Sequence, residues 1–146
     1  MSDAPLLGDQ LCFVMYAASR SLTNAYRPGL ARLGLTYPQF VTLLVVAEHD
    51  GLGVAELAAR LHLDASTLSP LLKRMEALGL IERTRSSTDE RRVVVTLTEA
   101  GRDMTGPAAE VREEVAARLA LTPEEAETLR TLSQRLIAGY EDTDPA

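Results

Sequence analysis

Hydrophobic positions recur at helical spacing along the first part of the chain. On one side these positions are Leu11, Val14, Ala18 and Leu22. The spacing predicts a helix from Asp9 to about Leu33, with Asp9 as its cap and a bend at the Arg-Pro-Gly of residues 27–29. Cys12 and Tyr16 form a second apolar row four residues apart. A helix that is apolar on two sides is expected to be buried on two sides, by its own core and by a second subunit.

Two helices with recognisable starts follow. Thr36-x-x-Gln39 is a capping box, which predicts a helix that runs to about Glu48. A short helix over residues 54–61 comes next, and Gly53 is placed to be its N-cap.

The hydrophobic period then changes from about four to two. Asp64 is expected to cap a further helix that runs to Leu78 and ends at Gly79. Beyond it, residues 81–85 and 93–97 alternate as strands do, and a polar loop joins them. The pattern predicts a two-stranded hairpin, which must pack on the helices before it because an isolated hairpin is marginal in water.

The last third of the chain is helical again. A stripe of Val111, Val115 and Leu119 predicts a helix that begins near Thr98. Thr122-x-x-Glu125 is a second capping box and opens a final helix. One face of that helix carries Leu129, Leu132 and Leu136.

Two short helices joined by a tight turn and followed by a hairpin form a winged helix-turn-helix. The predicted fold class is therefore mainly α with a small β-hairpin. The 146 residues have the length of a single domain, 1–146. Residues 36–98 are expected to form the winged helix-turn-helix, between flanking helices in 1–35 and 99–140.

The distribution of charge singles out the middle of the chain. The net charge is −6 overall, yet residues 60–102 alone carry a net +2. A protein basic throughout is excluded, whereas a local nucleic-acid-binding patch is not. A single cysteine and two distant histidines indicate no intrachain disulfide, metal or other cofactor. We see neither a membrane-length apolar run nor a signal peptide, and we expect a cytoplasmic protein.

The helix over residues 65–78 has the composition of a DNA-recognition helix. It carries Ser66, Thr67, Ser69, Lys73 and Arg74. Hydroxyl groups near the N-terminal half can contact bases or phosphates, and the two cations are suited to phosphates. Scattered charges more often mark a solvated face, and the helix alone would be a weak signal.

The hairpin supports the same interpretation independently. Arg91 near its tip can enter the narrow, electronegative minor groove, and Asp89 can direct the guanidinium by a bidentate pair. Arg83 and Arg85 on the first strand complete the predicted DNA-binding set. The alternative is an exposed salt bridge in a turn, which contributes little.

Cys12 is the candidate for redox chemistry. With Asp9 as the cap, it occupies the third position of its helix, where backbone N–H groups favour a thiolate. The negative charge of Asp9 opposes this effect. Tyr16 lies one turn away, and phenolic groups can donate hydrogen bonds to a thiolate. The alternative is an inert buried cysteine that packs as a small hydrophobe.

These residues carry a resemblance to a known family. The order of elements and the wing motif Asp89-x-Arg91 resemble the MarR family of dimeric bacterial repressors. Further segments resemble its organic hydroperoxide-sensing branch, OhrR, over about residues 6–138. They are Asp9-Gln10-Leu11-Cys12-Phe13, Tyr16-Ala17-Ala18-Ser19-Arg20, Tyr26-Arg27-Pro28, Leu35-Thr36-Tyr37-Pro38-Gln39 and Leu71-Leu72-Lys73-Arg74-Met75-Glu76.

The resemblance implies a redox-controlled repressor. It implies that 1–35 and 99–140 dimerise, that Cys12 reacts with the peroxide, and that Tyr26 and Tyr37 hydrogen-bond its sulfur across the dimer interface, with Tyr16 nearby. The reduced homodimer then binds a pseudo-palindromic operator in double-stranded DNA, and an organic hydroperoxide releases it. An apolar pocket for the peroxide is expected near Cys12, lined by Phe13, Tyr16 and Phe40.

Two features depart from relatives. This chain has no second, resolving cysteine, which points to the single-cysteine class, whose sulfenic acid condenses with a low-molecular-weight thiol. An intersubunit disulfide, a sulfenamide and overoxidation stay open. Gly53 replaces a threonine cap that relatives often have, and glycine caps nearly as well.

Two other functions stay open on the sequence alone. The chain can be a repressor released by a phenolic or other small ligand, with Cys12 incidental. It can also be a thiol peroxidase, although the missing resolving cysteine and the wing arginine weigh against an enzyme.

Overall fold

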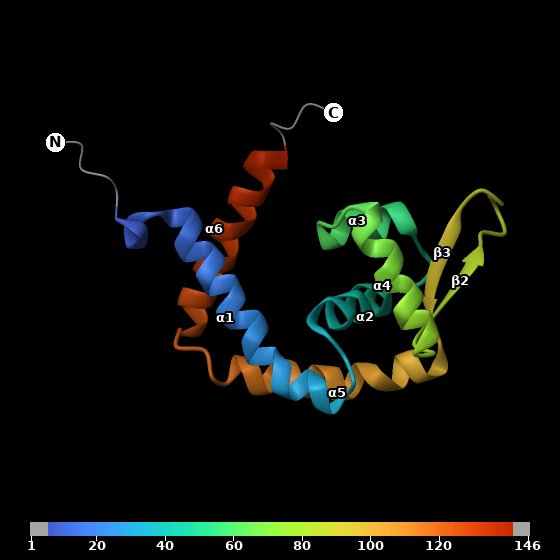
Figure 1. Cartoon of the computed structure of the whole chain (residues 1–146), viewed down its shortest axis with the longest axis horizontal. Helices are drawn as coiled ribbons and strands as arrows, with labels where there is room; N and C mark the ends of the chain where they lie inside the picture. Colours follow the sequence, from blue (N-terminus) through green and yellow to red (C-terminus); the bar gives the residue numbers. More distant parts are fainter. Residues whose placement is uncertain (1–5, 142–146) are drawn as a thin grey trace. The chain divides into compact units, whose positions relative to one another are not determined.

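The computed structural model describes residues 6–141, which divide into two units, one up to Glu113 and one from Glu114. Figure 1 shows the helices and strands of the chain. The elements are a 3-10 turn Leu7–Asp9, α1 (Leu11–Arg32), α2 (Tyr37–Glu48), β1 (Leu52–Gly53), α3 (Val54–Leu61), α4 (Ala65–Ala77), β2 (Ile81–Arg85), β3 (Val93–Leu97), α5 (Glu99–Ala116) and α6 (Pro123–Glu141). The predicted fold class, mainly α with a small sheet, is confirmed.

The start of α2 is held by the predicted capping box. The backbone N–H of Thr36 donates to Oε1 of Gln39 at 2.9 Å. Leu35 before the cap and Phe40 after it are both buried, as a hydrophobic staple requires. Because Leu43 and Val46 are buried on the same helix, α2 forms the centre of the core in this unit.

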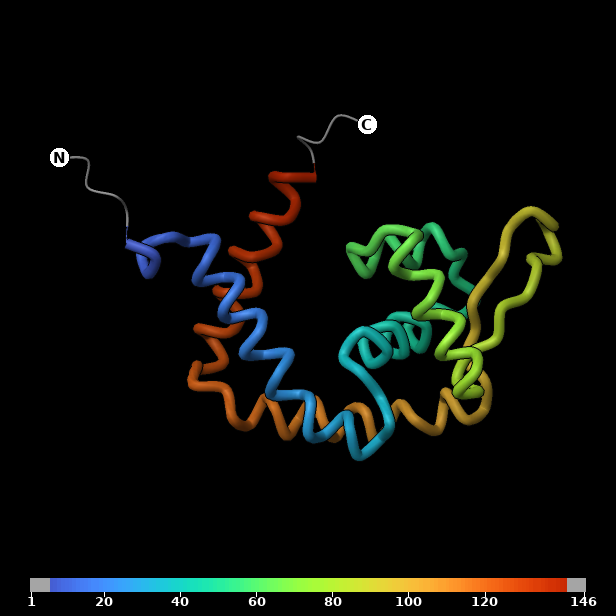
Figure 2. The backbone as a smooth tube through the Cα atoms, viewed as in Figure 1, coloured from blue at the N-terminus to red at the C-terminus, as the bar shows by residue number. Residues whose placement is uncertain are grey.

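The helix-turn-helix consists of α3 and α4, and Figure 2 traces the chain from these helices into the hairpin. His62 closes the tight turn in a left-handed conformation, with φ of 51°. Asp64 caps α4 by accepting the backbone N–H of Thr67 at 2.7 Å. One side of α4 is buried in the core through Leu68, Leu71, Leu72 and Met75. The opposite side is therefore free for contact with another molecule.

The sheet has three strands, in the order β1-β3-β2, and all pairs are antiparallel. The hairpin of β2 and β3 is in the predicted place, with Arg83 opposite Val95. The expectation of two strands was incomplete, because β1 pairs with β3 through Leu52 and Gly53. Two residues are too few to show an alternating pattern, so only the tertiary structure reveals this strand. It joins the start of α3 to the middle of β3.

The first helix differs from its prediction in three respects. Its N-cap is Gln10 and not Asp9, which lies in the preceding 3-10 turn. The helix runs on through Pro28 to Arg32. Its only buried residues are Gly29 and Leu30, so most of its apolar positions are exposed in the single chain and the predicted burial by its own core is wrong there.

The C-terminal end of α1 lies against α5. A Cβ on Gly29 would lie 2.6 Å from Cγ1 of Val111, which shows how closely the two helices approach. The predicted stripe on α5 is correct for the buried Val111 and Val115, but the helix ends at Ala116, before Leu119.

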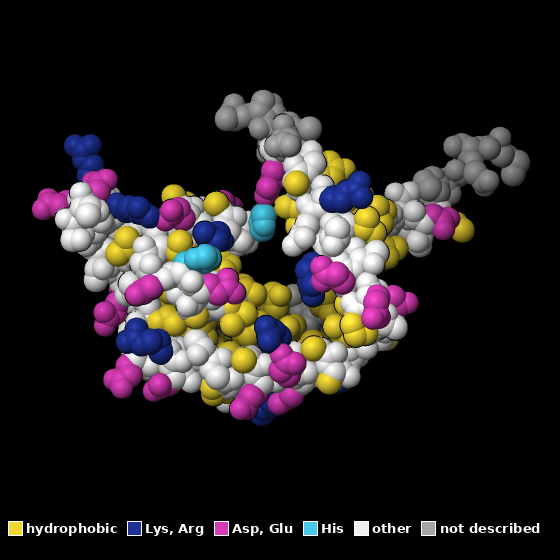
Figure 3. Space-filling model, turned by 180° about the vertical axis from the view of Figure 1, so that it is seen from behind, with side chains coloured by type: hydrophobic (Ala, Val, Ile, Leu, Met, Phe, Trp, Pro, Cys, Tyr) yellow, Lys and Arg dark blue, Asp and Glu magenta, His cyan; other side chains and the backbone are white. Residues whose placement is uncertain are grey.

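The second unit contains α6. Its start has the predicted capping box: the N–H of Thr122 donates to Glu125 Oε2 at 2.8 Å, and the N–H of Glu125 donates to Thr122 Oγ1 at 3.2 Å. None of its described residues is buried, and Leu129, Leu132 and Leu136 are exposed. On the face that Figure 3 shows, hydrophobic side chains reach the surface among charged ones.

Among the described residues, no single helix is long and apolar enough to cross a membrane. The helices α1 and α2 reach the required length and composition only as a pair, with an 81° bend between them.

Candidate nucleic-acid interface and cysteine site

The exposed side of α4 carries all five residues that the sequence predicted for it. Ser66, Thr67, Ser69, Lys73 and Arg74 are exposed. Because the buried leucines and Met75 hold the other side in the core, these side chains form one polar face. The face combines hydroxyl groups near the helix start with cations farther along, as a helix that reads a DNA groove requires.

The hydroxyl of Ser66 already has a partner. It donates to Oδ1 of Asp64 at 2.6 Å. This bond, followed by the backbone N–H of Thr67, lowers the pKa of the Asp64 carboxyl. Asp64 is therefore ionised at neutral pH, and it directs the Ser66 hydroxyl toward the helix cap. The oxygen of Ser66 retains lone pairs that can accept a hydrogen bond from a base or a protein group.

The loop between β2 and β3 is shaped by local hydrogen bonds. Asp89 accepts the backbone N–H of Arg91 at Oδ1, 3.0 Å away, and its carbonyl accepts the N–H of Arg92 at 2.9 Å. The N–H of Ser86 closes the loop by donating to the carbonyl of Arg92 at 2.7 Å. The predicted bidentate pair is absent from the described residues, because Asp89 binds the backbone of Arg91 and not its guanidinium. Asp89 therefore shapes the turn and leaves the Arg91 side chain exposed.

The two arginines of β2 differ in availability. Arg83 donates to Oε2 of Glu76 through Nη2 at 2.7 Å and Nε at 3.1 Å, which joins β2 to α4. This contact lowers the pKa of Glu76. Arg85 has no ion pair in the part of the chain that the structure describes. A DNA contact by Arg83 stays a prediction. It requires Arg83 to contact DNA while it is paired with Glu76.

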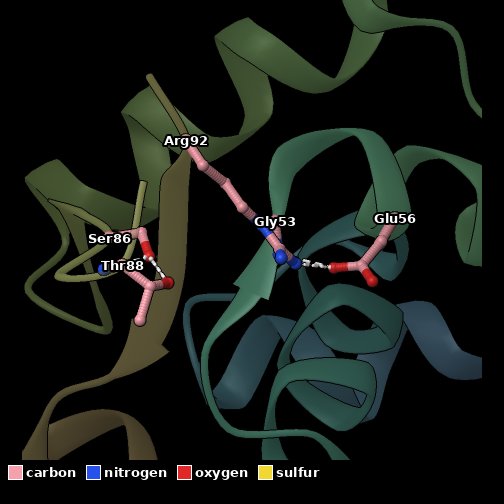
Figure 4. A network of polar contacts seen from close by, with 5 residues as sticks. All are labelled: Gly53, Glu56, Ser86, Thr88 and Arg92. Carbon is pink, nitrogen blue, oxygen red and sulfur yellow. Dashed lines mark hydrogen bonds and ion pairs between the residues drawn. The ribbon is translucent and has the colours of Figure 1, made fainter. Parts of the chain in front are cut away.

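A groove of about 640 Å³ separates the first turn of α3 from the wing. It is lined by Gly53, Val54, Ala55, Glu56, Asp89, Arg91, Arg92 and Val93. Arg92 crosses it and forms an ion pair with Glu56 on α3 (Figure 4). Sequence reasoning left both residues out of the site, since 36 positions separate them.

Cys12 is exposed in the first turn of α1. With Gln10 as the N-cap, it is the second residue of the helix and not the third. No side chain caps this end of α1, so backbone N–H groups of the first turn are left for another acceptor.

Tyr16 lies one turn beyond Cys12 and is 57% exposed. Its hydroxyl oxygen accepts a hydrogen bond from Nη1 of Arg20 at 3.1 Å, and the guanidinium carbon lies 5.7 Å from the centre of the ring. The phenolic hydrogen stays available as a donor. Arg20 was absent from the predicted site, although its spacing of four residues from Tyr16 could have indicated the contact.

Tyr26 and Tyr37 lie in a half-buried aromatic cluster. Their ring centres are 5.2 Å apart with the rings edge to face, and Phe40 lies 5.2 Å from Tyr26. Burial is the main cause that raises the pKa of both phenols, and the charge of Tyr37 adds to the effect on Tyr26. Both tyrosines are therefore protonated donors at neutral pH.

A single chain does not bring this cluster to Cys12. Tyr26 and Cys12 occupy opposite parts of α1, and the rise of an α-helix separates them by about 20 Å along its axis. Phe40 is only 2% exposed and packs against Tyr26, so it does not line a pocket at Cys12 as the sequence suggested. The predicted sensor residues thus form two separate groups in one chain.

Comparisons with known proteins identify the family. The family described as "Transcriptional regulator SarA/Rot" matches residues 24–106. The organic hydroperoxide resistance transcriptional regulator of Bacillus subtilis (strain 168) is 43% identical over 130 residues, which are 89% of this chain and 86% of that protein. The chain belongs to the MarR/SarA-type winged-helix transcriptional regulators.

Other relatives agree with this assignment. The HTH-type transcriptional regulator MgrA of Staphylococcus aureus is 35% identical over 98% of both chains. A structure of reduced AbfR bound to DNA superposes with a TM-score of 0.75 at 31% identity, covering 90% of this chain and 93% of that chain. Another structure shows overoxidised AbfR bound to DNA, with the same TM-score and identity. The chain is thus a DNA-binding transcriptional regulator of MarR type.

Within this family, the polar face of α4 and the exposed Arg85 and Arg91 are the parts of the regulator that suit DNA. Both lie in the unit up to Glu113, so one compact unit carries them. The roles of individual residues in this set stay predictions.

Proposed function

We propose that this regulator is a homodimeric repressor that senses organic hydroperoxides through oxidation of Cys12 and then releases a pseudo-palindromic operator. The observation that carries the proposal is the exposed thiol in the uncapped first turn of α1. The similarity to a regulator named for organic hydroperoxide resistance supports the choice of oxidant. The chain is a sensor in this proposal and not an enzyme, because each oxidation ends in loss of DNA.

The chemistry is a two-electron oxidation of sulfur. The thiolate of Cys12 attacks the outer oxygen of a hydroperoxide ROOH, the O–O bond breaks, and the alcohol ROH leaves after taking a proton. Cys12 becomes a sulfenic acid. A low-molecular-weight thiol R′SH then condenses with it, forming a mixed disulfide and releasing water. The adduct adds volume in a region that we propose is packed in the dimer, and packed interfaces tolerate added volume poorly.

A second subunit supplies what one chain lacks. The hydrophobic side chains of Leu11 and Val14 are exposed near Cys12, and those of Leu132 and Leu136 are exposed on α6. Burial of such faces between two copies removes apolar surface from water. In this dimer, Tyr26 and Tyr37 of the partner donate their phenolic hydrogens to the sulfur of Cys12, which their raised pKa values permit at neutral pH.

The test is operator binding under oxidation. Fluorescence anisotropy is measured at fixed salt on DNA from upstream of the regulator's own gene, with cumene hydroperoxide and a small thiol added. We expect wild type to dissociate and Cys12→Ser to stay bound. A further control, Ser19→Ala, removes a hydroxyl from the exposed surface of the same helix and is expected to respond as wild type.

Other results would contradict the proposal in distinct ways. If both proteins stay bound, Cys12 is incidental, and phenolic and other small ligands become the compounds to screen. If wild type instead consumes peroxide continuously with a thiol reductant while bound to DNA, the chain is a thiol peroxidase.

A further inference from the structure

The Glu56–Arg92 pair joins two parts of the DNA-binding unit that are remote in sequence. Glu56 lies in the first turn of α3, whose Leu57 is completely buried and fixes that helix in the core. Arg92 is the last residue of the wing loop, directly before β3. In Figure 4 the Arg92 side chain extends from the wing across Gly53 to the carboxylate of Glu56.

The backbone of Gly53 fixes the carboxylate side of this contact. The N–H of Gly53 donates to Oε2 of Glu56 at 3.0 Å, and the same oxygen receives Nη2 of Arg92. The bond from Gly53 is the main cause of the lowered pKa of Glu56, and the charge of Arg92 adds to it. Glu56 therefore stays ionised at neutral pH and presents a fixed acceptor to the wing.

Gly53 is also required for space. Its backbone has φ of −67° and ψ of 151°, a conformation that any residue adopts. A Cβ at this position, however, would lie 2.8 Å from Nε and 3.1 Å from Nη2 of Arg92. Glycine thus permits the guanidinium to lie directly over residue 53, where a larger residue displaces it.

The other side of the wing loop is held as well. The hydroxyls of Ser86 and Thr88 lie 3.0 Å apart, and the Ser86 N–H binds the Arg92 carbonyl at 2.7 Å. The backbone of Arg92 is therefore part of the loop closure that also sets the position of its neighbour Arg91. A fixed Arg92 side chain orients that closure relative to α3.

We propose that Arg92 is a positioning residue: paired with Glu56 over Gly53, it holds the wing against α3 and presents Arg91 to the DNA, without contacting phosphate itself. The pair is about half exposed, at 48% for Arg92 and 55% for Glu56. Exposed pairs add little to stability. The pair instead sets the position of the wing, because it spans the groove between the wing and the helix-turn-helix.

The salt dependence of operator binding distinguishes the role of Arg91 from that of Arg92. Each cation that neutralises a phosphate adds about one to the slope of log K against log salt concentration. Arg91→Met should therefore weaken binding and reduce the slope by about one for each subunit. Arg92→Met should weaken binding roughly three- to tenfold, the size of ordinary coupling between neighbours, and reduce the slope by clearly less than Arg91→Met does.

A double-mutant cycle tests the link between them. If Arg92 acts through Arg91, Arg91→Met should cost less affinity in the Arg92→Met background than in wild type. The duplex used for this test is designed with an A·T-rich segment at the position of the wing, because a narrow minor groove attracts arginine.

Gly53→Ser is a second way to break the contact of Arg92 with Glu56, and it leaves the net charge unchanged. Its Cβ displaces the Arg92 guanidinium, while serine is a better N-cap than glycine and keeps α3 stable. We expect it to weaken operator binding, as Arg92→Met does, and to match wild type in thermal unfolding. Glu56→Gln should release Arg92 toward phosphate and steepen the slope. Glu127→Gln, which removes a carboxylate paired with Arg130 on α6, is the control for net charge.

Two results would overturn the proposal. If Arg92→Met reduces the slope as much as Arg91→Met does, Arg92 is a phosphate contact. If Arg92→Met and Gly53→Ser both bind the operator as wild type does, the pair does not position the wing.

Discussion

Gly101 lies where the first turn of α5 passes over the backbone of Leu80. A Cβ at residue 101 would lie 2.0 Å from the carbonyl oxygen of Leu80, which is main chain and already accepts the N–H of Thr98 at 3.1 Å. Thr98 adds to this junction, because its hydroxyl donates to the carbonyl of Gly79 at 2.5 Å and accepts the N–H of Gly101 at 3.0 Å. The junction leaves no room for a larger residue.

Gly101→Ala is therefore expected to destabilise the fold by about 1–3 kcal/mol, the usual cost of overpacking, because the backbone itself must shift. The measurement is urea denaturation followed by circular dichroism. Gly139→Ala is the control, since a Cβ there has no neighbour within 4 Å. Equal stability of Gly101→Ala and wild type would show that α5 can move away from Leu80 freely.

Single residues of the DNA-binding face also show how partners change a role. Spacing identified Ser66 and Arg83 as donors, but Asp64 and Glu76 hold them in the folded chain. Arg85 and Arg91 have no such partner among residues 6–141. The sequence thus identified residues of the right type for DNA contact, but it did not show which of them are already bound to a partner in the folded chain.

The aromatic rings of Tyr26 on α1 and of Tyr37 and Phe40 on α2 pack against one another. Both phenols have a raised pKa because burial disfavours the charged form. The folded chain therefore holds these protons to a higher pH than the unfolded chain, in which tyrosine titrates near 10. The stabilisation is fully present below about pH 10 and is lost as the pH rises through the folded-state pKa values.

Ionisation of the tyrosines should therefore change the midpoint temperature of unfolding little between pH 8 and about 9.5. Above about pH 10 the midpoint temperature should fall. Tyr37→Phe is expected to flatten this fall, because it removes one of the two buried phenols. Tyr140→Phe removes a phenol that is 75% exposed and is the control. The same fall in Tyr37→Phe as in wild type would mean that another group causes it.

The helices most securely predicted were those with a chemical start signal. The capping boxes at Thr36 and Thr122 and the cap at Asp64 are all observed. The prediction of Asp9 as the cap of the first helix was wrong, because the chain makes a 3-10 turn there before α1 begins. Local hydrogen bonds at a cap depend on nearby residues alone, whereas the choice between two adjacent polar caps depends on the path of the chain.

For the whole molecule, the exposed apolar faces are the main feature that the single chain leaves unexplained. Leu11 is 61% exposed on α1, and Leu132 is 48% exposed on α6. Exposed apolar residues in this number mark an interaction surface in soluble proteins. In the proposed dimer, these faces are buried.

Leu132→Asp is expected to shift the protein toward monomer and to weaken operator binding, because a charge in an apolar interface is costly. Sedimentation equilibrium gives the subunit stoichiometry, and anisotropy gives the affinity. Gln134→Asp places the same charge on an exposed polar position of α6 and should remain dimeric. A dimeric Leu132→Asp with normal affinity would exclude this part of α6 from the interface.

The sequence by itself determined the order of elements, the starts of the capped helices, the hairpin and the polar face of α4, because periodicity and caps depend on residues close together in the chain. It also identified Cys12 as the one thiol. Only the tertiary structure decided the third strand at Leu52, the contact of Glu56 with Arg92 and the contact of Tyr26 with Phe40. These are relations between distant segments, set by how the helices pack, and no local pattern encodes them.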